Sequence, residues 1–217
     1  TDQQAIELKS EIINAVKDQM TGLLIDKTIG LGAYSEHNKP FLLPVEKSGY
    51  TDQSGERVTE LEYSAQQLKE LGASGAKILL YFNPTAGSAK TQIEIAKKVL
   101  VDCQENNLPF FLEIRIYKPD TGDELGNDTA ELLLGSLKMM NANSIKPDVW
   151  KLEYPGSLVD CQKVSELVGT TPWILLTRGA SFEVFTGQLR QAVKAGAVGF
   201  LAGRALWQEV CTLEELE

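Results

Sequence analysis

The stretch Asp148-Val149-Trp150-Lys151-Leu152-Glu153-Tyr154-Pro155-Gly156 carries a lysine within a run of apolar and aromatic residues. Its apolar and aromatic residues are typical of a buried strand, which Pro155-Gly156 ends. Lys151 lies where a core residue is expected, and burying a charged ammonium group is costly. We therefore expect Lys151 either to be paired with a carboxylate or to act as a neutral amine.

Strands and helices alternate along the chain on both sides of this stretch. Seven nearly continuous apolar segments are predicted strands, and they end near Asp26, Glu46, Phe82, Glu113, Lys151, Thr177 and Ala202. Helices are predicted over 1–20, 59–71, 92–106, 127–141, 159–167 and 182–195. This alternation is typical of a parallel sheet covered by helices. We find no linker or low-complexity segment and expect one domain over residues 1–217.

Polar side chains gather at or just past the carboxyl ends of the predicted strands. A TIM (β/α)8 barrel keeps its active site at that end. An open doubly wound sheet also binds ligands there, but no Gly-x-Gly-x-x-Gly motif follows a strand in this chain. We therefore predict an α/β fold of the TIM-barrel type, in which one of the eight strands is unaccounted for.

Composition excludes several classes of function. The 217 residues are 43% hydrophobic and 24% charged, which is ordinary for a globular protein. A net charge of -9 argues against a nucleic-acid partner. No run approaches the roughly 18 apolar residues of a membrane span, and no signal peptide opens the chain. We expect neither nucleic acid nor membrane as a partner.

The cysteines and the one histidine limit the chemistry further. Cys103, Cys161 and Cys211 are widely separated and odd in number, which fits a reducing cytoplasm better than a disulfide framework. His37 lies in a loop-like segment. Because zinc sites that polarise carbonyl groups typically use two or three histidines, we expect no metal and no other cofactor.

Charges of both signs are expected to converge inside the barrel. Alternation along a strand places Lys151 and Glu153 on one face. The set that this argument brings together is Asp26, Glu46, Lys77, Glu113, Arg115, Lys151 and Glu153. One interpretation is a buried ion-pair network that stabilises the barrel. The other is an active site, because so much buried charge is expensive without a function.

In the second interpretation Lys151 is a nucleophile. A neutral lysine amine attacks a ketone or aldehyde and forms an iminium, but the free amine has a pKa near 10.4. Lys77 is the candidate cation that lowers it, because two like charges about 4 Å apart cost up to about 4 kcal/mol at an effective dielectric constant of 20. Glu113 is the candidate acid/base, and Asp26 or Glu46 could act on a substrate hydroxyl group.

The last two predicted strands lead into a candidate anion site. Gly179 and Gly203 each follow a strand and precede a helix, and Arg204 adds a positive charge. Phosphate sites in barrels commonly use the loops after strands 7 and 8 together with a helix N-terminus. We therefore expect these residues to bind phosphate.

Several motifs resemble a known family. Segments 76–81, 109–114, 148–153 and 199–205 are similar to class I tagatose-bisphosphate aldolases and to sulfofructose-phosphate aldolases. Segments 44–49 and 147–151 are still more similar to the aldolase-like domain found beside deoxygluconokinase in inositol catabolism. The resemblance runs from about Thr21 to Val210, and it is specific for the superfamily and not for the substrate.

The resemblance implies roles for individual residues. Lys151 matches the Schiff-base lysine, Lys77 the second active-site lysine and Glu113 the catalytic carboxylate. Thr177 falls where tagatose-bisphosphate aldolases have a serine, and Gly203 with Arg204 matches the phosphate-binding pair. Arg178 departs from the small residue that is usual between that serine and the following glycine.

The front of the chain departs further from the family. The family's first strand carries an Asp-Gln-Arg or Asp-His-Arg motif, whereas the sequence that follows Asp26-Lys27 fits the second strand better. We therefore expect a barrel without its first strand, and a chain that is part of a longer protein. The N-terminal helix or a second copy in a homo-oligomer would cover the open seam.

We thus predict a metal-independent class I aldolase or lyase that acts on a small phosphorylated ketose or sugar-acid. Two alternatives stay open: a non-catalytic barrel that binds sugar phosphates or regulates, and a dehydratase or isomerase that also forms a Schiff base.

Overall fold

The computed structural model describes residues 1–34, 39–53, 55–122, 125 and 128–203. Seven parallel strands form one sheet in the order β1, β2, β5, β6, β7, β8, β9. They are β1 (Leu23–Leu24), β2 (Phe41–Pro44), β5 (Gly75–Phe82), β6 (Phe110–Ile116), β7 (Val149–Leu152), β8 (Trp173–Leu176) and β9 (Gly199–Leu201). Each corresponds to one of the seven predicted strands, so the expected strand number and the parallel arrangement are confirmed.

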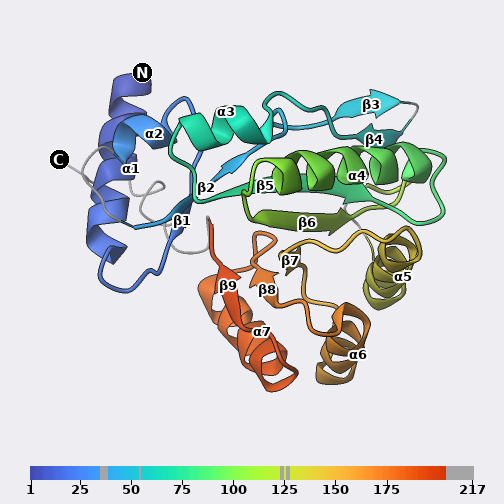
Figure 1. Cartoon of the computed structure of the whole chain (residues 1–217). Helices are drawn as coiled ribbons and strands as arrows, with labels where there is room; N and C mark the ends of the chain where they lie inside the picture. Colours follow the sequence, from blue (N-terminus) through green and yellow to red (C-terminus); the bar gives the residue numbers. More distant parts are fainter. Residues whose placement is uncertain (35–38, 54, 123–124, 126–127, 204–217) are drawn as a thin grey trace.

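The sheet curves into a nearly closed barrel with helices on its outside (Figure 1). Among the described residues, β1 pairs only with β2 and β9 only with β8, so these two strands are the edges of the sheet. The helices are α1 (Asp2–Val16), α2 (Gly30–Ala33), α3 (Ala65–Glu70), α4 (Ala89–Glu105), α5 (Thr129–Ala142), α6 (Leu158–Val168) and α7 (Phe182–Lys194). α1 and α2 lie beside the β1 edge (Figure 1).

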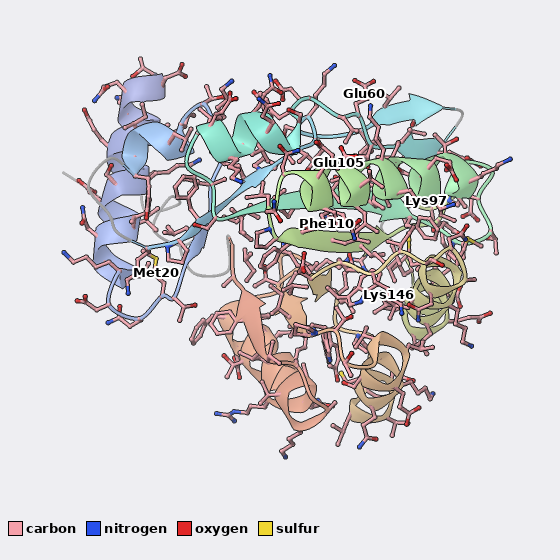
Figure 2. The ribbon with its side chains drawn as sticks, in the orientation of Figure 1. Met20, Glu60, Lys97, Glu105, Phe110 and Lys146 are labelled. Carbon is pink, nitrogen blue, oxygen red and sulfur yellow. The ribbon has the colours of Figure 1, made fainter. Side chains whose placement is uncertain are left out.

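Alternation along each strand separates an apolar outer face from a polar interior. In β5, Ile78 and Leu80 on the outer face are completely buried, whereas Leu79 and Tyr81 between them are partly exposed. The helices complete the outer layer with apolar stripes, such as Ala89, Ile93, Ala96, Val99 and Cys103 of α4. Lys97 and Glu105 carry charge on α4, and Phe110 lies at the start of the neighbouring strand β6 (Figure 2). The continuous apolar layer therefore lies between sheet and helices, and the charged residues are left for the interior.

The segment between β2 and β5 differs from the prediction. A helix was expected over 59–71, but α3 covers only Ala65–Glu70, and residues 51–58 before it form a hairpin of β3 (Thr51–Gln53) and β4 (Glu56–Val58). Thr59 contacts β5 of the barrel, because its hydroxyl group donates a hydrogen bond to the Leu79 carbonyl at 2.8 Å. The helix begins only at Ala65, where the Ser64 side chain accepts a hydrogen bond from the Gln67 amide and caps the first turn.

Gln92 of α4 connects the hairpin to the barrel. Its side chain is completely buried, and its amide nitrogen donates to the Arg57 carbonyl at 3.0 Å and to the Tyr81 carbonyl at 2.9 Å. Arg57 in turn stacks on Tyr50, Tyr81 and Tyr117, with its guanidinium carbon 4.7 to 5.4 Å from the ring centres. One buried amide thus holds the aromatic cluster at the carboxyl end of β5.

Candidate active site

Lys151 and Glu113 meet inside the barrel because their strands are neighbours in register. The pairing of β6 with β7 sets Glu113 directly beside Lys151. The Lys151 amine donates a hydrogen bond of 2.6 Å to Glu113 Oε2. Both residues are buried, with 6% and 8% of their surface exposed. Lys151 is therefore both buried and paired with a carboxylate.

Lys77 of β5 completes a three-strand cluster. Its amine lies 3.4 Å from the same Glu113 oxygen and donates to Glu46, which follows β2. Because one oxygen contacts both lysines, their nitrogens lie no further apart than the two contact distances combined. Glu46 Oε2 is buried without a hydrogen-bond partner among the described residues. The four residues form a chain of alternating charge from β2 to β7.

The pKa values of the two lysines are shifted in opposite directions. Burial lowers the pKa of the Lys151 amine; the Glu113 carboxylate opposes this shift and the like charge of Lys77 adds to it. Burial acts in the same direction on Lys77, but Glu113 and Glu46 outweigh it and raise the pKa of Lys77 above its usual value. Burial opposes ionisation of Glu113 as well, but the two lysines hold the pKa of that carboxyl group below its usual range. Lys77 is thus the resident cation, and Lys151 is the amine that loses its proton more readily.

A second ion pair joins the residues that follow β7 and β8. Glu153, two residues beyond Lys151, is 1% exposed and accepts a hydrogen bond of 2.8 Å from Arg178. The sequence placed Glu153 inside the barrel correctly, but it did not indicate that Arg178 would reach it. The only signal was Arg178 itself, a long cationic residue in the turn where a small one was expected.

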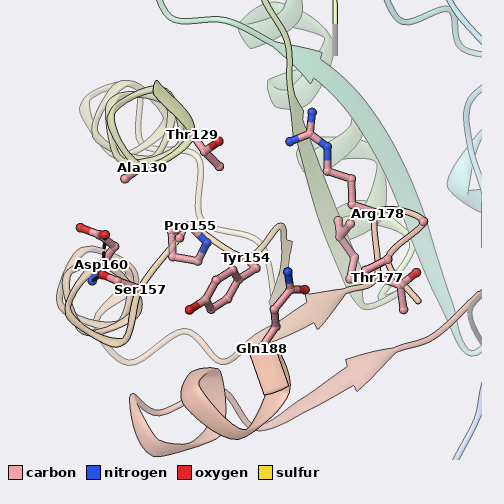
Figure 3. Close-up of a pocket in the computed structure, with 13 residues that line it drawn as sticks. Thr129, Ala130, Tyr154, Pro155, Ser157, Asp160, Thr177, Arg178 and Gln188 are labelled. Atoms are coloured by element: carbon pink, nitrogen blue, oxygen red, sulfur yellow. Dashed lines mark hydrogen bonds between the residues drawn. The ribbon is translucent and has the colours of Figure 1, made fainter. Parts of the chain in front are cut away.

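The turn after β8 lines a cavity of about 590 Å³. Thr177, Arg178 and Gly179 form one wall of it, and the loop from Tyr154 to Ser157 another (Figure 3). Arg178 and Gly179 both have positive φ, 46° and 77°, and the Thr177 carbonyl accepts the Ala180 amide at 2.9 Å. This geometry is that of a type I′ turn.

The second half of the predicted phosphate site is described only in part. Gly203 follows β9, and a Cβ atom built on it would meet nothing within 4 Å. Arg204 lies outside the described residues. The predicted phosphate-binding roles of these residues therefore stay predictions.

Asp26 lies at the carboxyl end of β1, but its contacts lead away from the barrel. Its carboxylate pairs with Lys9 of α1 and accepts the Ile29 and Gly30 amides at the start of α2. Partial burial opposes ionisation, but these partners lower the pKa of Asp26 to about 2. The residue also lines a cavity of about 410 Å³ together with Glu46 and Lys77. A catalytic role for Asp26 thus remains a prediction, with contacts in the structure that also explain it as a helix cap.

Neither cavity is lined by Lys151 or Glu113. Lys77 lines one of the two cavities, and the turn after β8 lines the other. Within the described part of the chain, no three His, Cys, Asp or Glu side chains are grouped so as to hold a metal ion. No helix in the same part is both long and apolar enough to cross a membrane.

The fold and the site together define an α/β barrel in which a buried amine and a buried carboxylate are paired on neighbouring strands. Residues 3–209 match the family described as DeoC/LacD family aldolase, and the chain belongs to this family. It is therefore an aldolase, a carbon–carbon lyase. It is 30% identical over 237 residues to the tagatose 1,6-diphosphate aldolase of Staphylococcus aureus strain JH9, covering 94% of this chain and 72% of the relative.

Solved structures agree with the fold. A Schiff-base-forming fructose-1,6-bisphosphate aldolase superposes with a TM-score of 0.74 at 22% identity, covering 92% of this chain and 78% of that chain. An archaeal fructose-1,6-bisphosphate aldolase, with its catalytic lysine covalently bound to the carbinolamine intermediate, gives 0.74 at 21% identity, covering 92% and 77%. The predicted aldolase family and the barrel fold are thus confirmed.

Proposed function

We propose that the protein is a class I aldolase whose nucleophile is Lys151 and whose substrate is a phosphorylated ketose or sugar-acid. One observation carries the proposal: the buried Lys151 amine, with its pKa lowered, lies 2.6 Å from Glu113 on the neighbouring strand. The names of the relatives support the substrate class, because they act on tagatose 1,6-diphosphate and fructose 1,6-bisphosphate.

The reaction starts when the neutral Lys151 amine attacks the substrate carbonyl carbon. The carbinolamine that forms loses water and becomes an iminium, which withdraws electrons from the neighbouring carbon–carbon bond. A base removes the proton of the substrate hydroxyl group, that bond breaks, and an aldehyde leaves while an enamine remains on Lys151. Protonation of the enamine carbon and addition of water release the ketone product and restore the amine.

Glu113 is the proposed acid/base. Its lowered pKa keeps it ionised at neutral pH, so that it can accept a proton, and its contact with Lys151 places it beside the reacting nitrogen. Lys77 keeps its charge and thereby favours the neutral form of Lys151. Glu46 and Asp26 are proposed to act on substrate hydroxyl groups. Thr177, Gly179, Gly203 and Arg204 are proposed to hold the phosphate.

Borohydride trapping tests the nucleophile. The protein is incubated with dihydroxyacetone phosphate or fructose 1,6-bisphosphate, reduced, digested and analysed by mass spectrometry. We expect a stable adduct on the peptide that contains Lys151, and no adduct on the Lys151→Met variant. Lys163→Met is the matched control, because Lys163 is a half-exposed surface lysine that pairs with Asp160.

The same experiment separates the alternatives. A wild-type protein that binds the sugar phosphate but gives no adduct would refute the aldolase mechanism in favour of a binding or regulatory barrel. An adduct without aldehyde release would indicate a dehydratase or isomerase. A single domain over 1–217, a cytoplasmic location and a homo-oligomer remain predictions.

A further inference from the structure

We propose that Arg178 is a specificity-determining residue that binds an anionic group of the substrate, a carboxylate or a phosphate, and that Glu153 is the positioning residue that aims it. The proposal rests on the proposed Schiff base at Lys151, because it places the anion relative to that amine. It gives a role to an ion pair that the mechanism above leaves unused.

The pair lies directly beyond the proposed nucleophile. Lys151 belongs to β7 and Glu153 comes directly after the last residue of that strand, two residues and therefore about 6 to 7 Å further along the chain. Arg178 Nη1 donates to Glu153 Oε2 at 2.8 Å. The guanidinium group is thus hydrogen-bonded to a residue that lies two positions beyond Lys151. A substrate of a few carbons, bound covalently at Lys151, is long enough to reach it.

Arg178 has a buried carboxylate partner and a strained backbone conformation. Its partner Glu153 is almost completely buried, and a buried carboxylate requires such a cation. Arg178 also adopts a φ of 46°, a conformation that costs free energy for any residue with a Cβ atom and that glycine would accept without strain. Residues held in such conformations cluster at functional sites. The turn therefore holds an arginine in place at a conformational cost.

Arg178 nevertheless remains accessible from the cavity after β8. Its side chain is 23% exposed, against 1% for Glu153. Figure 3 shows it extending from the end of β8, away from Ser157 and Asp160 on the far wall. Among the described residues that line this cavity it is the one cation, and the Asp160 carboxylate opposite is engaged with Ser157 and Lys163. A guanidinium group in such a place suits bidentate binding of a carboxylate or phosphate.

One neutral and two anionic ketones test whether Arg178 binds a negatively charged group of the substrate. Wild type and Arg178→Gln are trapped with borohydride over a range of concentrations of dihydroxyacetone, dihydroxyacetone phosphate and pyruvate. We expect Arg178→Gln to lose about 10- to 100-fold in preference for an anionic ketone, the size expected for one hydrogen bond between charged groups, with little change for dihydroxyacetone. If only trapping of dihydroxyacetone phosphate is weakened, the group that Arg178 binds is a phosphate. If only trapping of pyruvate is weakened, that group is a carboxylate. Arg190→Gln makes the same change at an exposed position of α7 and should behave as wild type.

Glu153→Gln tests the positioning role. It keeps the shape of the side chain but removes its charge. We expect the half-saturating concentration of the anionic ketone to rise while the maximal rate and the result with dihydroxyacetone stay near wild type. An equal loss for all three ketones in Arg178→Gln would overturn the proposal, because a purely structural ion pair does not distinguish substrates by charge.

A binding measurement keeps the two proposals separable. Calorimetry follows dihydroxyacetone phosphate and pyruvate binding to Lys151→Met, which cannot form the Schiff base, and to Lys151→Met combined with Arg178→Gln. We expect at least one of the anions to bind the single variant and to bind the double variant more weakly. Equal binding of both anions to the two proteins refutes the role of Arg178. Absence of trapping on the wild-type protein refutes the Schiff base instead.

Discussion

At the scale of single residues, the site depends on one carboxylate shared by two lysines. Glu113 contacts both amines, so that one of them remains a cation and the other is more easily deprotonated. Burial alone would lower both pKa values, and Glu46 decides which lysine keeps its proton because it contacts Lys77. The asymmetry between the two lysines therefore originates at Glu46, which follows β2 and lies outside the strands that carry Glu113 and Lys151.

Replacing Lys77 tests this arrangement through pH. In the wild-type protein the neutral form of Lys151 becomes populated as the pH rises through a pKa below its usual value. Lys77→Met removes the like charge and leaves Glu46 and Glu113, so we expect the pKa of Lys151 to rise. The pH profile of trapping should move to higher pH, and the reaction at neutral pH should become about tenfold slower for every pH unit that the profile moves.

Lys77→Arg is the control, because it keeps the positive charge. Its profile should stay at the wild-type pH even if the larger side chain lowers the rate. An unchanged or acid-shifted profile for Lys77→Met would contradict the assigned role.

At the scale of elements, α4 holds the hairpin and the end of β5 through Gln92. Removing this side chain leaves the Arg57 and Tyr81 carbonyls without their buried donor. We expect Gln92→Ala to lower the free energy of unfolding by about 1–3 kcal/mol, the cost of unpaired buried polar groups. Urea denaturation followed by circular dichroism measures the change.

Gln104→Ala makes the same substitution at an exposed position of α4 and should change stability by no more than about 0.5 kcal/mol. Equal effects of the two substitutions would show that helix propensity, and not the buried amide, accounts for the loss.

At the scale of the whole molecule, the barrel has two edges in its described part. β1 and β9 each have one neighbour, and Phe200 of β9 is 51% exposed although its ring packs edge-on against Phe185. Strands with one neighbour open without disturbing a second ladder of hydrogen bonds. We expect the amides of β1 and β9 to exchange with deuterium faster than those of β6 and β7, as measured by mass spectrometry on the native protein.

The same experiment at several protein concentrations tests whether a second copy covers these edges. Protection of β9 that equals that of β6 at every concentration would contradict the open-edged arrangement. Protection that grows with concentration would support the predicted homo-oligomer.

The sequence by itself determined the alternation of strands and helices, the seven strands and the strand positions of Lys77, Glu113 and Lys151. These features depend on local periodicity and on where apolar runs stop, both of which are visible along the chain. Asp26 shows the limit, because a carboxylate at a strand end can as well cap the next helix as face the barrel.

Only the tertiary structure decided which side chains meet. The sharing of Glu113 by two lysines, the reach of Arg178 to Glu153 and the hydrogen bond from the Arg57 amide of the hairpin to the Tyr117 hydroxyl group depend on register between segments 25 to 60 residues apart. Local periodicity carries no information about that register. The sequence therefore predicted Lys151 as the reactive amine, while the relative placement of neighbouring strands determined which charged groups surround it.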